Sequence, residues 1–389
     1  MIDLSDSAVS ERVSGFVPGT MSTDARVALD ARMIWSALIE PGDGVAGALI
    51  ASHGPRRALE IAIDESITLG AGAREITEGR RRWLPRASEA VGASAAARRA
   101  GVEAVTPEQT DWPSRVDDLG VHAPPCLWFA GRRESLRAGG AAVAIVGARA
   151  ATTYGEYVVG EMVAELAGSA VAIVSGGAYG IDGMAHRAAL AAGGPTVAWL
   201  AGGVDRPYPS AHRGLLEAVV ASGGAVVADV PCGSAPTKWR FLARNRLIAA
   251  STDATVVIEA GWRSGSLNTA GHAAQLGRPL GAVPGPITSA SSAGCHRLLR
   301  EFDAQCVTGA DDVREMLGLS TAAPTLFDDA TGSDLTRVLD AMTSRQARLL
   351  DEIARRSGLT TERAQKALGL LQLEGRVERT ENGWRTTRR

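Results

Sequence analysis

Short apolar runs alternate with helical patterns in the middle of the chain. Val159, Val163 and Leu166, for example, recur at the spacing of one helix face. Strands without polar alternation are buried on both faces, and helices between them can cover both faces. The pattern predicts a Rossmann-like α/β core with a mostly parallel sheet. Its predicted strands are residues 142–146, 170–174, 196–200, 225–229, 255–258 and 280–283.

The residues before this core favour helices. Residues 25–104 are rich in Ala, Arg, Leu and Ile, with helical runs that Gly and Pro interrupt. The prolines at 107, 113, 124 and 125 then predict an extended connector with little helix. We therefore expect a small N-terminal helical domain over residues 1–106. A core domain over residues 107–318 follows it and begins with the Pro-rich segment.

The C-terminal part has a different pattern. Residues 319–334 are rich in Ser, Thr, Ala, Pro and Asp and lack periodicity, which predicts a flexible linker. Residues 347–356 predict a helix, Gly358 interrupts it, and a second helix follows. Residues 381–383, Glu-Asn-Gly, are typical of a hairpin turn. Two helices and a hairpin predict a winged-helix domain over residues 335–389, with duplex DNA contact and protein docking both open as its role.

Composition limits where a charged ligand can bind. The chain has 389 residues, 45% of them hydrophobic, which is enough for two or three domains with sizeable cores. Its formal net charge is -2. Because no global positive field attracts nucleic acid, any such site must be a local patch.

The cysteines and the first residues of the chain bear on the cellular compartment in which the protein is expected. Cys126, Cys232, Cys295 and Cys306 form no CxxC pair, so we expect neither a metal site nor a disulfide framework, but a reducing environment. Residues 1–12 are polar, unlike a secretory signal. No apolar stretch approaches the length of a membrane span. We expect a cytoplasmic protein without a membrane span.

Glycine and small polar residues follow the predicted strands. In an open parallel sheet these loops meet at one edge, where ligands bind. Glycine lets backbone amides approach phosphate oxygens, and helix N-termini favour anions. For any single loop, a glycine that turns the chain is a sufficient explanation; the convergence of several loops with an arginine predicts an anion site. Its residues are Gly147, Arg149, Ser175, Gly176, Ser264, Gly265 and Ser266.

Residues 238–246 concentrate cationic and aromatic side chains. Cations neutralise phosphates, an aromatic ring stacks on an unpaired base, and an amide reaches a sugar or a base edge. The alternative is an amphipathic helix with a basic, solvated face. The chain has no GxGxxG after the first strand and no P-loop, so a long polyanion fits better than a nucleotide cofactor. The predicted contacts are Lys238, Phe241, Arg244, Asn245 and Arg246.

Several short motifs follow one another between residues 142 and 309. They are Gly147-Ala148-Arg149 with Tyr154-Gly155, Ser175-Gly-Gly-Ala-Tyr-Gly-Ile-Asp-Gly-Met-Ala-His186, Gly202-Gly-Val-Asp-Arg-Pro-Tyr-Pro209, Phe241-Leu-Ala-Arg-Asn-Arg246, Glu259 with Ser264-Gly-Ser-Leu-Asn-Thr-Ala270, and Val283-Pro-Gly285. In this order they resemble the signature of the DNA-processing protein DprA (Smf) family. With weaker motifs, the resemblance extends to a small helical (SAM-like) N-terminal domain, and relatives often carry a winged helix.

The resemblance implies a protein that binds and protects single-stranded DNA and helps to load the RecA recombinase, as in natural transformation. It also implies a homodimer and no cofactor. In that family the Arg of a Gly-Ser-Arg motif contacts phosphate, which by position is Arg149. The residues around a Phe-Pro-x-Arg-Asn-Arg motif line the DNA pocket, which by position are Lys238, Phe241, Asn245 and Arg246.

The chain departs from the family pattern at three places. Ala148 stands where the family often has Ser or Thr, which removes a hydroxyl group that could bond phosphate. Leu242 replaces the usual Pro, and Ala228-Asp229 replaces a common Ser-Glu pair. The last two departures are expected to adjust only local geometry.

An enzymatic function is the alternative. Ser175, Asp182 and His186 have the residue types of a hydrolase triad, but Asp182 and His186 share a helix face and Asp182 is placed to cap that helix. Residues 175–177, Ser-Gly-Gly, are also similar to nucleoside-phosphate hydrolases of the lysine-decarboxylase-like family. Residues 284–286, Pro-Gly-Pro, do not supply that family's Pro-Gly-Gly-x-Gly-Thr loop. We therefore expect a mediator that is not an enzyme, with nucleoside-phosphate hydrolysis as the alternative.

Overall fold

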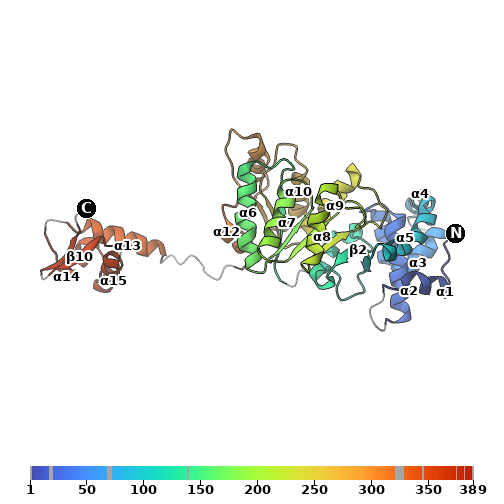
Figure 1. Ribbon diagram of the computed structural model, residues 1–389, viewed down its shortest axis with the longest axis horizontal. Coiled ribbons are helices and arrows are strands. Elements are labelled where there is room, and N and C mark those ends of the chain that lie inside the picture. Colours follow the sequence, from blue (N-terminus) through green and yellow to red (C-terminus); the bar gives the residue numbers. More distant parts are fainter. Residues whose placement is uncertain are drawn as a thin grey trace. The chain divides into compact units, whose positions relative to one another are not determined.

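The chain forms two compact units, Met1–Leu319 and Ser320–Arg389 (Figure 1). The computed structural model describes residues 2–16, 21–67, 72–137, 140–319, 328–343, 346–373, 375–380 and 382–387. Among these residues, no helix is both long enough and apolar enough to cross a membrane.

A mostly parallel sheet forms the centre of the first unit. Within its described residues the strand order is β1-β2-β6-β5-β4-β3-β7-β8-β9. The strands from β3 to β9 pair in parallel, while β2 pairs antiparallel with both β1 and β6. The strands are β1 (Glu103–Val105), β2 (Leu127–Gly131), β3 (Ala142–Val146), β4 (Ala172–Ser175), β5 (Thr196–Trp199), β6 (Ala225–Ala228), β7 (Ala254–Val257), β8 (Leu280–Ala282) and β9 (Gln305–Cys306).

The predicted strands are confirmed as β3 to β8, each within two residues of the predicted range. The edge strands β1, β2 and β9 were not predicted. β1 and β2 flank the Pro-rich segment, which was predicted as an extended connector and in fact also contains the 3-10 helix Ser114–His122. These edge strands are short and pair with partners far away in the chain, so no local pattern marks them.

Helices cover both faces of the sheet, as the buried strands require. Along β3, Val143 and Ile145 pack on one face, and Ala144 and Val146 pack on the other. One face carries α6 (Thr153–Gly168), α7 (Ile181–Ala191), α8 (Arg213–Ala221) and α12 (Ala310–Met316). The other carries α9 (Lys238–Ala250), α10 (Ser266–Gln275) and α11 (Ala293–Glu301). Figure 1 shows α6, α7 and α8 next to one another along the sheet. This confirms the Rossmann-like fold.

The N-terminal helices lie against the antiparallel end of the sheet. Within this group of helices, Trp35 and Trp83 meet edge to face, with ring centroids 5.2 Å apart. Trp128 of β2 is fully buried beneath these helices and donates through Nε1 to Ser36 Oγ at 3.1 Å. The helices are α1 (Asp6–Val13), α2 (Thr23–Leu38), α3 (Gly44–Ile63), α4 (Ala73–Trp83) and α5 (Ala87–Arg99).

The remaining short helices and the kink in α3 complete the first unit. Gly54 interrupts α3 with a φ of 75° directly before Pro55, because a residue without Cβ adopts this conformation without strain. Further 3-10 helices lie at Leu84–Arg86, Arg133–Arg137, Ser210–His212 and Ala290–Ser292. The predicted domain boundary at residue 106 falls directly after β1, although β1 pairs with the sheet.

The second unit contains three helices and a hairpin in its described residues. They are α13 (Asp328–Asp340), α14 (Leu350–Ser357), α15 (Thr361–Leu373), β10 (Val377–Thr380) and β11 (Gly383–Thr386). The antiparallel pairing of β10 with β11 confirms the predicted hairpin. Of its predicted turn, Glu381 lies outside the described residues.

The predicted linker over residues 319–334 needs a correction. Residues 320–327 lie outside the described residues, and residues 328–334 belong to α13. Asp334 in this helix is buried and accepts two hydrogen bonds from the Arg363 guanidinium, at 2.8 and 3.0 Å. Val338 lies in the core of the unit. Tertiary contacts therefore stabilise a helix whose sequence has no strong helical pattern.

Candidate nucleic-acid interface

A cleft lies beyond the carboxyl ends of β3 and β7. These strands are adjacent in the sheet although β4, β5 and β6 separate them along the chain, so the strand order reverses here. Ligands of open parallel sheets bind at such a switch point. The cleft has a volume of about 840 Å³ and is lined by the loop after β3, the loop after β7 and the helices α9 and α10.

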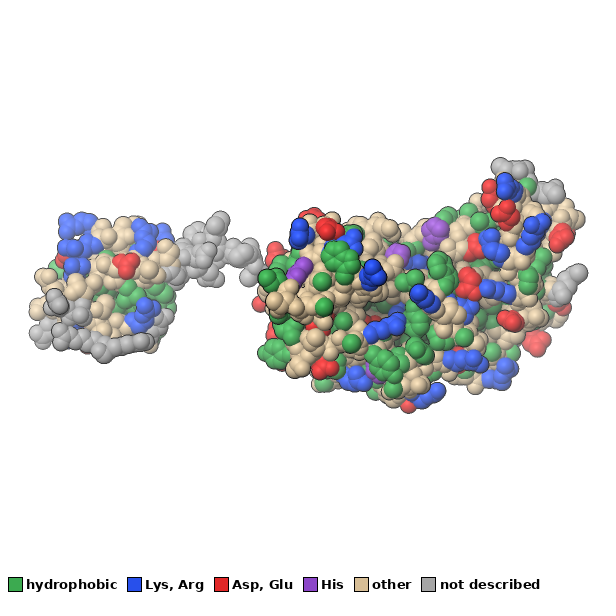
Figure 2. Space-filling view, turned by 90° about the horizontal axis from the view of Figure 1, so that it is seen from above, with side chains coloured by type: hydrophobic (Ala, Val, Ile, Leu, Met, Phe, Trp, Pro, Cys, Tyr) green, Lys and Arg blue, Asp and Glu red, His purple; other side chains and the backbone are tan. Residues whose placement is uncertain are grey.

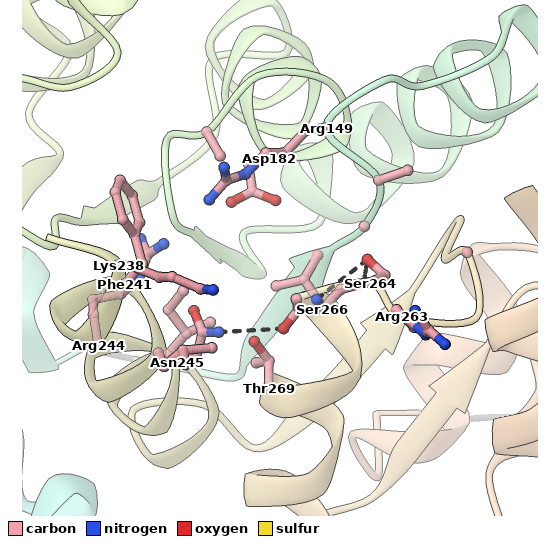
Figure 3. A pocket seen from close by; sticks show the side chains of 18 of the residues that line it. Arg149, Asp182, Lys238, Phe241, Arg244, Asn245, Arg263, Ser264, Ser266 and Thr269 are labelled. Atoms are coloured by element: carbon pink, nitrogen blue, oxygen red, sulfur yellow. Dashed lines mark hydrogen bonds between the residues drawn. The ribbon is translucent and has the colours of Figure 1, made fainter.

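Three cations of the cleft form no salt bridge with any described residue. Arg149, Lys238 and Arg263 line the cleft, and no salt bridge joins any of them to another described residue. Figure 3 shows the Lys238 side chain extending into the middle of the cleft, opposite Ser266. The rest of the surface is mixed: on the face in Figure 2, Lys and Arg side chains of the first unit are interspersed with Asp and Glu. The positive charge is therefore local.

Phe241 contributes a partly exposed ring beside these cations. The Arg149 guanidinium lies over this ring, with Cζ 5.1 Å from the ring centroid. Tyr208 meets the same ring at 5.6 Å with an interplanar angle of 62°, and its own side chain is half-exposed. The cleft thus offers both a cation and aromatic faces, the combination that binds single-stranded nucleic acid.

Helix α9 is exposed at its N-terminal end and buried at its C-terminal end, so its exposed and buried residues do not lie on opposite faces. Thr237 caps it, since its hydroxyl oxygen accepts from Arg240 N at 3.2 Å. The first turn carries Lys238 and the exposed Trp239, whereas the second half, from Arg244 on, is buried. The alternative of an amphipathic helix with a basic solvated face is therefore wrong, because the arginines of the second half point into the protein.

The N-terminus of α10 forms the opposite wall. Gly265 is the N-cap, and Ser264 Oγ accepts from Ser266 N at 3.4 Å. Because Ser264, Gly265 and Ser266 line the cleft, the positive dipole end of the helix faces it. The hydroxyl groups of Ser264 and Ser266 are 2.7 Å apart. Asn245 of α9 donates through Nδ2 to Gly265 O at 3.3 Å and to Asn268 Oδ1 at 3.2 Å, which fixes the two helices to each other.

A buried pair of charges supports the floor of the cleft. Arg244 donates to the carbonyl oxygens of Gly176, at 2.8 Å, and Trp199, while its Nε has no partner among the described residues. Burial lowers the pKa of Arg244 to about 10, although the charge of Asp182 opposes the shift. Arg244 therefore stays protonated at neutral pH. Burial raises the pKa of Asp182, whose carboxylate accepts from Gly176 N at 3.1 Å.

The glycines of these loops are required by close approach. A Cβ on Gly176 would lie 2.3 Å from Arg244 Nη1, and a Cβ on Gly147 would lie 2.6 Å from Ile181 Cγ1. Neither distance is possible for real atoms. The loops can thus lie against the floor and against α7 only with glycine at these positions.

Most of the predicted site residues come together in the cleft. Three do not line it. Ser175 is fully buried and donates through Oγ to Ile145 O at 2.6 Å, and Gly176 lies behind Arg244. Arg246 forms a buried salt bridge with Asp229 at 2.8 Å and donates to His122 O. The predicted residues that line the cleft are Gly147, Arg149, Lys238, Phe241, Arg244, Asn245, Ser264, Gly265 and Ser266.

Of the lining residues that were not among the predicted contacts, four carry polar side chains: Tyr208, Asp182, Arg263 and Thr269. Tyr208 and Asp182 lie within the quoted motifs, but no local property marks them as ligand contacts. Arg263 follows β7 and precedes Ser264, so its place beside the predicted loop was the available signal.

Ser175, Asp182 and His186 do not assemble a triad. His186 Nδ1 donates to Thr196 Oγ1 at 2.7 Å, because that hydroxyl group donates its own proton to Ile173 O. Burial lowers the pKa of His186 to about 3, so the imidazole is neutral at pH 7. The prediction that Asp182 caps α7 is also wrong. Gly180 is the N-cap, and Asp182 bonds the loop before it.

The described residues contain no group of three or more His, Cys, Asp or Glu side chains that could hold a metal ion. The four cysteines are free; Cys126 and Cys295 are buried. The cleft thus provides unpaired cations, a helix N-terminus and aromatic rings, a set of groups suited to a polyanion that carries bases.

The fold and the cleft define a class: a doubly wound α/β core with a cationic, aromatic cleft at its switch point, accompanied by a small unit with helices and a hairpin. Two family models match the chain, DNA recombination-mediator protein A over residues 103–318 and the DprA winged helix domain over residues 320–383. The chain belongs to the DprA family of DNA-processing recombination mediators.

Relatives and solved structures agree with this assignment. The putative DNA processing protein DprA of Mycobacterium tuberculosis is 40% identical over 371 residues, which cover 91% of this chain and 93% of the relative. The crystal structure of DprA from Streptococcus pneumoniae matches with a TM-score of 0.60 and 29% identity, covering 73% of this chain and 95% of that chain. DNA processing protein A from Helicobacter pylori, described for its single-stranded DNA binding mode, matches with a TM-score of 0.50 and 29% identity, covering 55% and 95%.

Proposed function

We propose that this chain binds single-stranded DNA in the cleft between β3 and β7 and acts there as a recombination mediator. The observation that carries the proposal is the convergence of Arg149, Lys238 and Arg263, none of which forms a salt bridge in the described structure, around the partly exposed Phe241 ring. Membership of the DprA family supports it, as does the single-stranded DNA binding described for the Helicobacter pylori relative.

The chemistry of the cleft favours single strands over duplex DNA. The unpaired cations bind phosphates whatever the base sequence. A base can lie on Phe241 or Tyr208 only when it is not stacked inside a duplex. The N-terminus of α10 and the Ser264 and Ser266 hydroxyl groups add a position for one more phosphate oxygen.

The same proposal includes the partners and the absence of catalysis. We assign RecA as the protein partner, a homodimer as the working state and the cytoplasm as the location, because the family resemblance implies them. The protein acts as a binding mediator and not as an enzyme. Ser175 and His186, the residues that a Ser-His-Asp triad would need, are buried and bonded to Ile145 O and Thr196 Oγ1.

The test compares single-stranded and duplex DNA across salt concentrations. Arg149→Ala and Lys238→Ala each remove one phosphate contact. Affinity for single strands should fall for every sequence, and the slope of log K against log salt should flatten by about 0.7 per variant. The matched control is Arg26→Ala, because Arg26 is exposed on α2 and lies outside the cleft. Folded variants that bind as tightly as the unaltered protein, with the same slope, would refute the site.

A further inference from the structure

An exposed stack of side chains lies outside the cleft. The Arg297 guanidinium of α11 lies over two aromatic rings, with Cζ 5.2 Å from the Trp262 centroid and 5.5 Å from the Phe302 centroid. Trp262 is 58% exposed and Phe302 is 40% exposed. Arg297 also pairs with Glu301 at 2.8 Å, which holds the guanidinium plane in place. These three residues, Trp262, Arg297 and Phe302, are the outer stack.

The outer stack is continuous with the cleft. Gly261 and Arg263, the two neighbours of Trp262 in the loop after β7, both line the cleft. The loop is held against the start of α11, because Ala260 N donates to Ser291 O at 2.8 Å and Gly294 N donates to Ala260 O at 2.7 Å. A Cβ on Gly294 would lie 2.7 Å from Ala260 O, so the backbones of the loop and of α11 are in direct contact. Trp262 is therefore fixed at the rim.

The chemistry of the outer stack matches that of nucleic-acid bases. Exposed aromatic rings and arginine planes stack on unpaired bases of any identity. A single exposed ring needs no explanation, but exposed rings that gather in one patch mark binding sites, and Trp262 and Phe302 gather around the same guanidinium. Arg263 supplies an unpaired cation between the cleft and Trp262, so a strand that leaves the cleft on this side keeps a phosphate partner at the step between them.

We propose that the outer stack is a second base-binding platform, which receives the nucleotides of a single strand where it leaves the cleft past Arg263. The proposal rests on the proposed function of the cleft. It extends the binding site from the cleft to α11. A strand long enough to reach Trp262 should therefore bind more tightly than one that only fills the cleft.

The experiment measures the affinity of full-length protein for two fluorescent oligothymidylates, one of about four nucleotides and one about four times as long. Trp262→Ala should weaken binding of the long oligonucleotide about five- to tenfold and leave the short one unchanged. The salt slope should not change, because no charge is removed. Trp262→Phe keeps a ring and should restore most of the affinity.

Tyr157→Ala is the matched control, because Tyr157 is an exposed aromatic residue of α6 outside the cleft lining and should have no effect on either length. An unchanged affinity of Trp262→Ala for the long oligonucleotide would overturn the proposal, and so would an equal loss on both lengths. A change in sedimentation without DNA would show that the outer stack binds a second copy of the chain instead. If the unaltered protein bound neither oligonucleotide, the proposed single-stranded DNA binding by the cleft would be refuted as well.

Discussion

The arginines in and around the cleft fall into two groups, those without a salt bridge and those in a buried ion pair. Arg149 and Arg263 face the cleft with no salt bridge in the described structure, whereas Arg246 is buried in an ion pair with Asp229. Arg244 lies between the two cases: it is buried, it bonds two carbonyl oxygens, and burial lowers its pKa to about 10. Binding energy should therefore come from the unpaired residues, and removing Arg246 should damage the fold, because it would leave Asp229 as an uncompensated buried charge.

At the residue scale, Phe241→Ala distinguishes a stacking platform from core packing. A stacking platform contributes about 1 to 3 kcal/mol per base, so the variant should lose that affinity for single strands with an unchanged salt slope and little change for duplex DNA. A DNA titration beside a thermal melt provides the measurement. If Phe241 only fills the interior, the variant should instead melt several degrees lower and bind every ligand less tightly.

At the element scale, α9 depends on a contact with the N-terminal helices. Glu40, directly after α2, accepts from Arg240 Nε at 3.0 Å and from Arg240 Nη2 at 2.9 Å. Arg86 Nη2 donates to the same carboxylate at 2.5 Å. Burial tends to raise the pKa of Glu40, but the hydrogen bonds and charges of Arg240 and Arg86 outweigh it, so the pKa lies below its usual value of 4.5. The contact thus favours the ionised carboxylate and holds the first turn of α9, which carries Lys238.

Glu40→Gln should weaken this contact. Because the carboxylate is partly exposed, we expect the melting temperature at pH 7 to fall by only about 1 to 3 °C, with a small loss of single-strand affinity. A carboxyl group with a lowered pKa stabilises the folded state above its unfolded pKa and loses this effect as pH falls through its folded pKa. The difference in melting temperature between the unaltered protein and Glu40→Gln should therefore have its full size above about pH 4.5 and should disappear as the pH falls below that value.

Thermal melts from pH 3 to pH 7 check this expectation. Glu89→Gln is the control, since Glu89 is an exposed residue of α5 with no salt bridge among the described residues. A pH-independent difference between Glu40→Gln and the unaltered protein would contradict the role given to the carboxylate charge.

At the scale of the whole molecule, the chain separates into two units with independent cores. The cleft is formed entirely by residues of Met1–Leu319. The second unit has its own apolar cluster, in which Ile353 and Leu368 are fully buried. Each unit therefore has a core of its own, as a segment that folds by itself requires.

A chain shortened after Leu319 should fold and keep its affinity for single strands to within about twofold, because it retains every residue that lines the cleft. Circular dichroism of the shortened chain measures its folding. An oligonucleotide titration of the shortened chain beside the unaltered protein measures its affinity for single strands. A shortened chain that folds but loses nearly all affinity would place the main DNA site in the winged-helix unit and not in the cleft.

The sequence alone determined the core of this protein and the loops that meet at its cleft. Short apolar runs without polar alternation, separated by helical patterns, favour the inner strands of a parallel sheet, so β3 to β8 were predictable. The loops after those strands must meet at one edge. Gly147, Arg149 and Ser264 could therefore be grouped from the sequence.

Only the tertiary structure decided which charges are free and where the sheet ends. Arg240 and Arg246 belong to the same basic run as Lys238, but Glu40 and Asp229 neutralise them from distant parts of the chain. The strand β2 exists because it pairs with β6, almost a hundred residues later. Both outcomes depend on contacts between segments far apart in sequence, and local composition carries no information about such contacts.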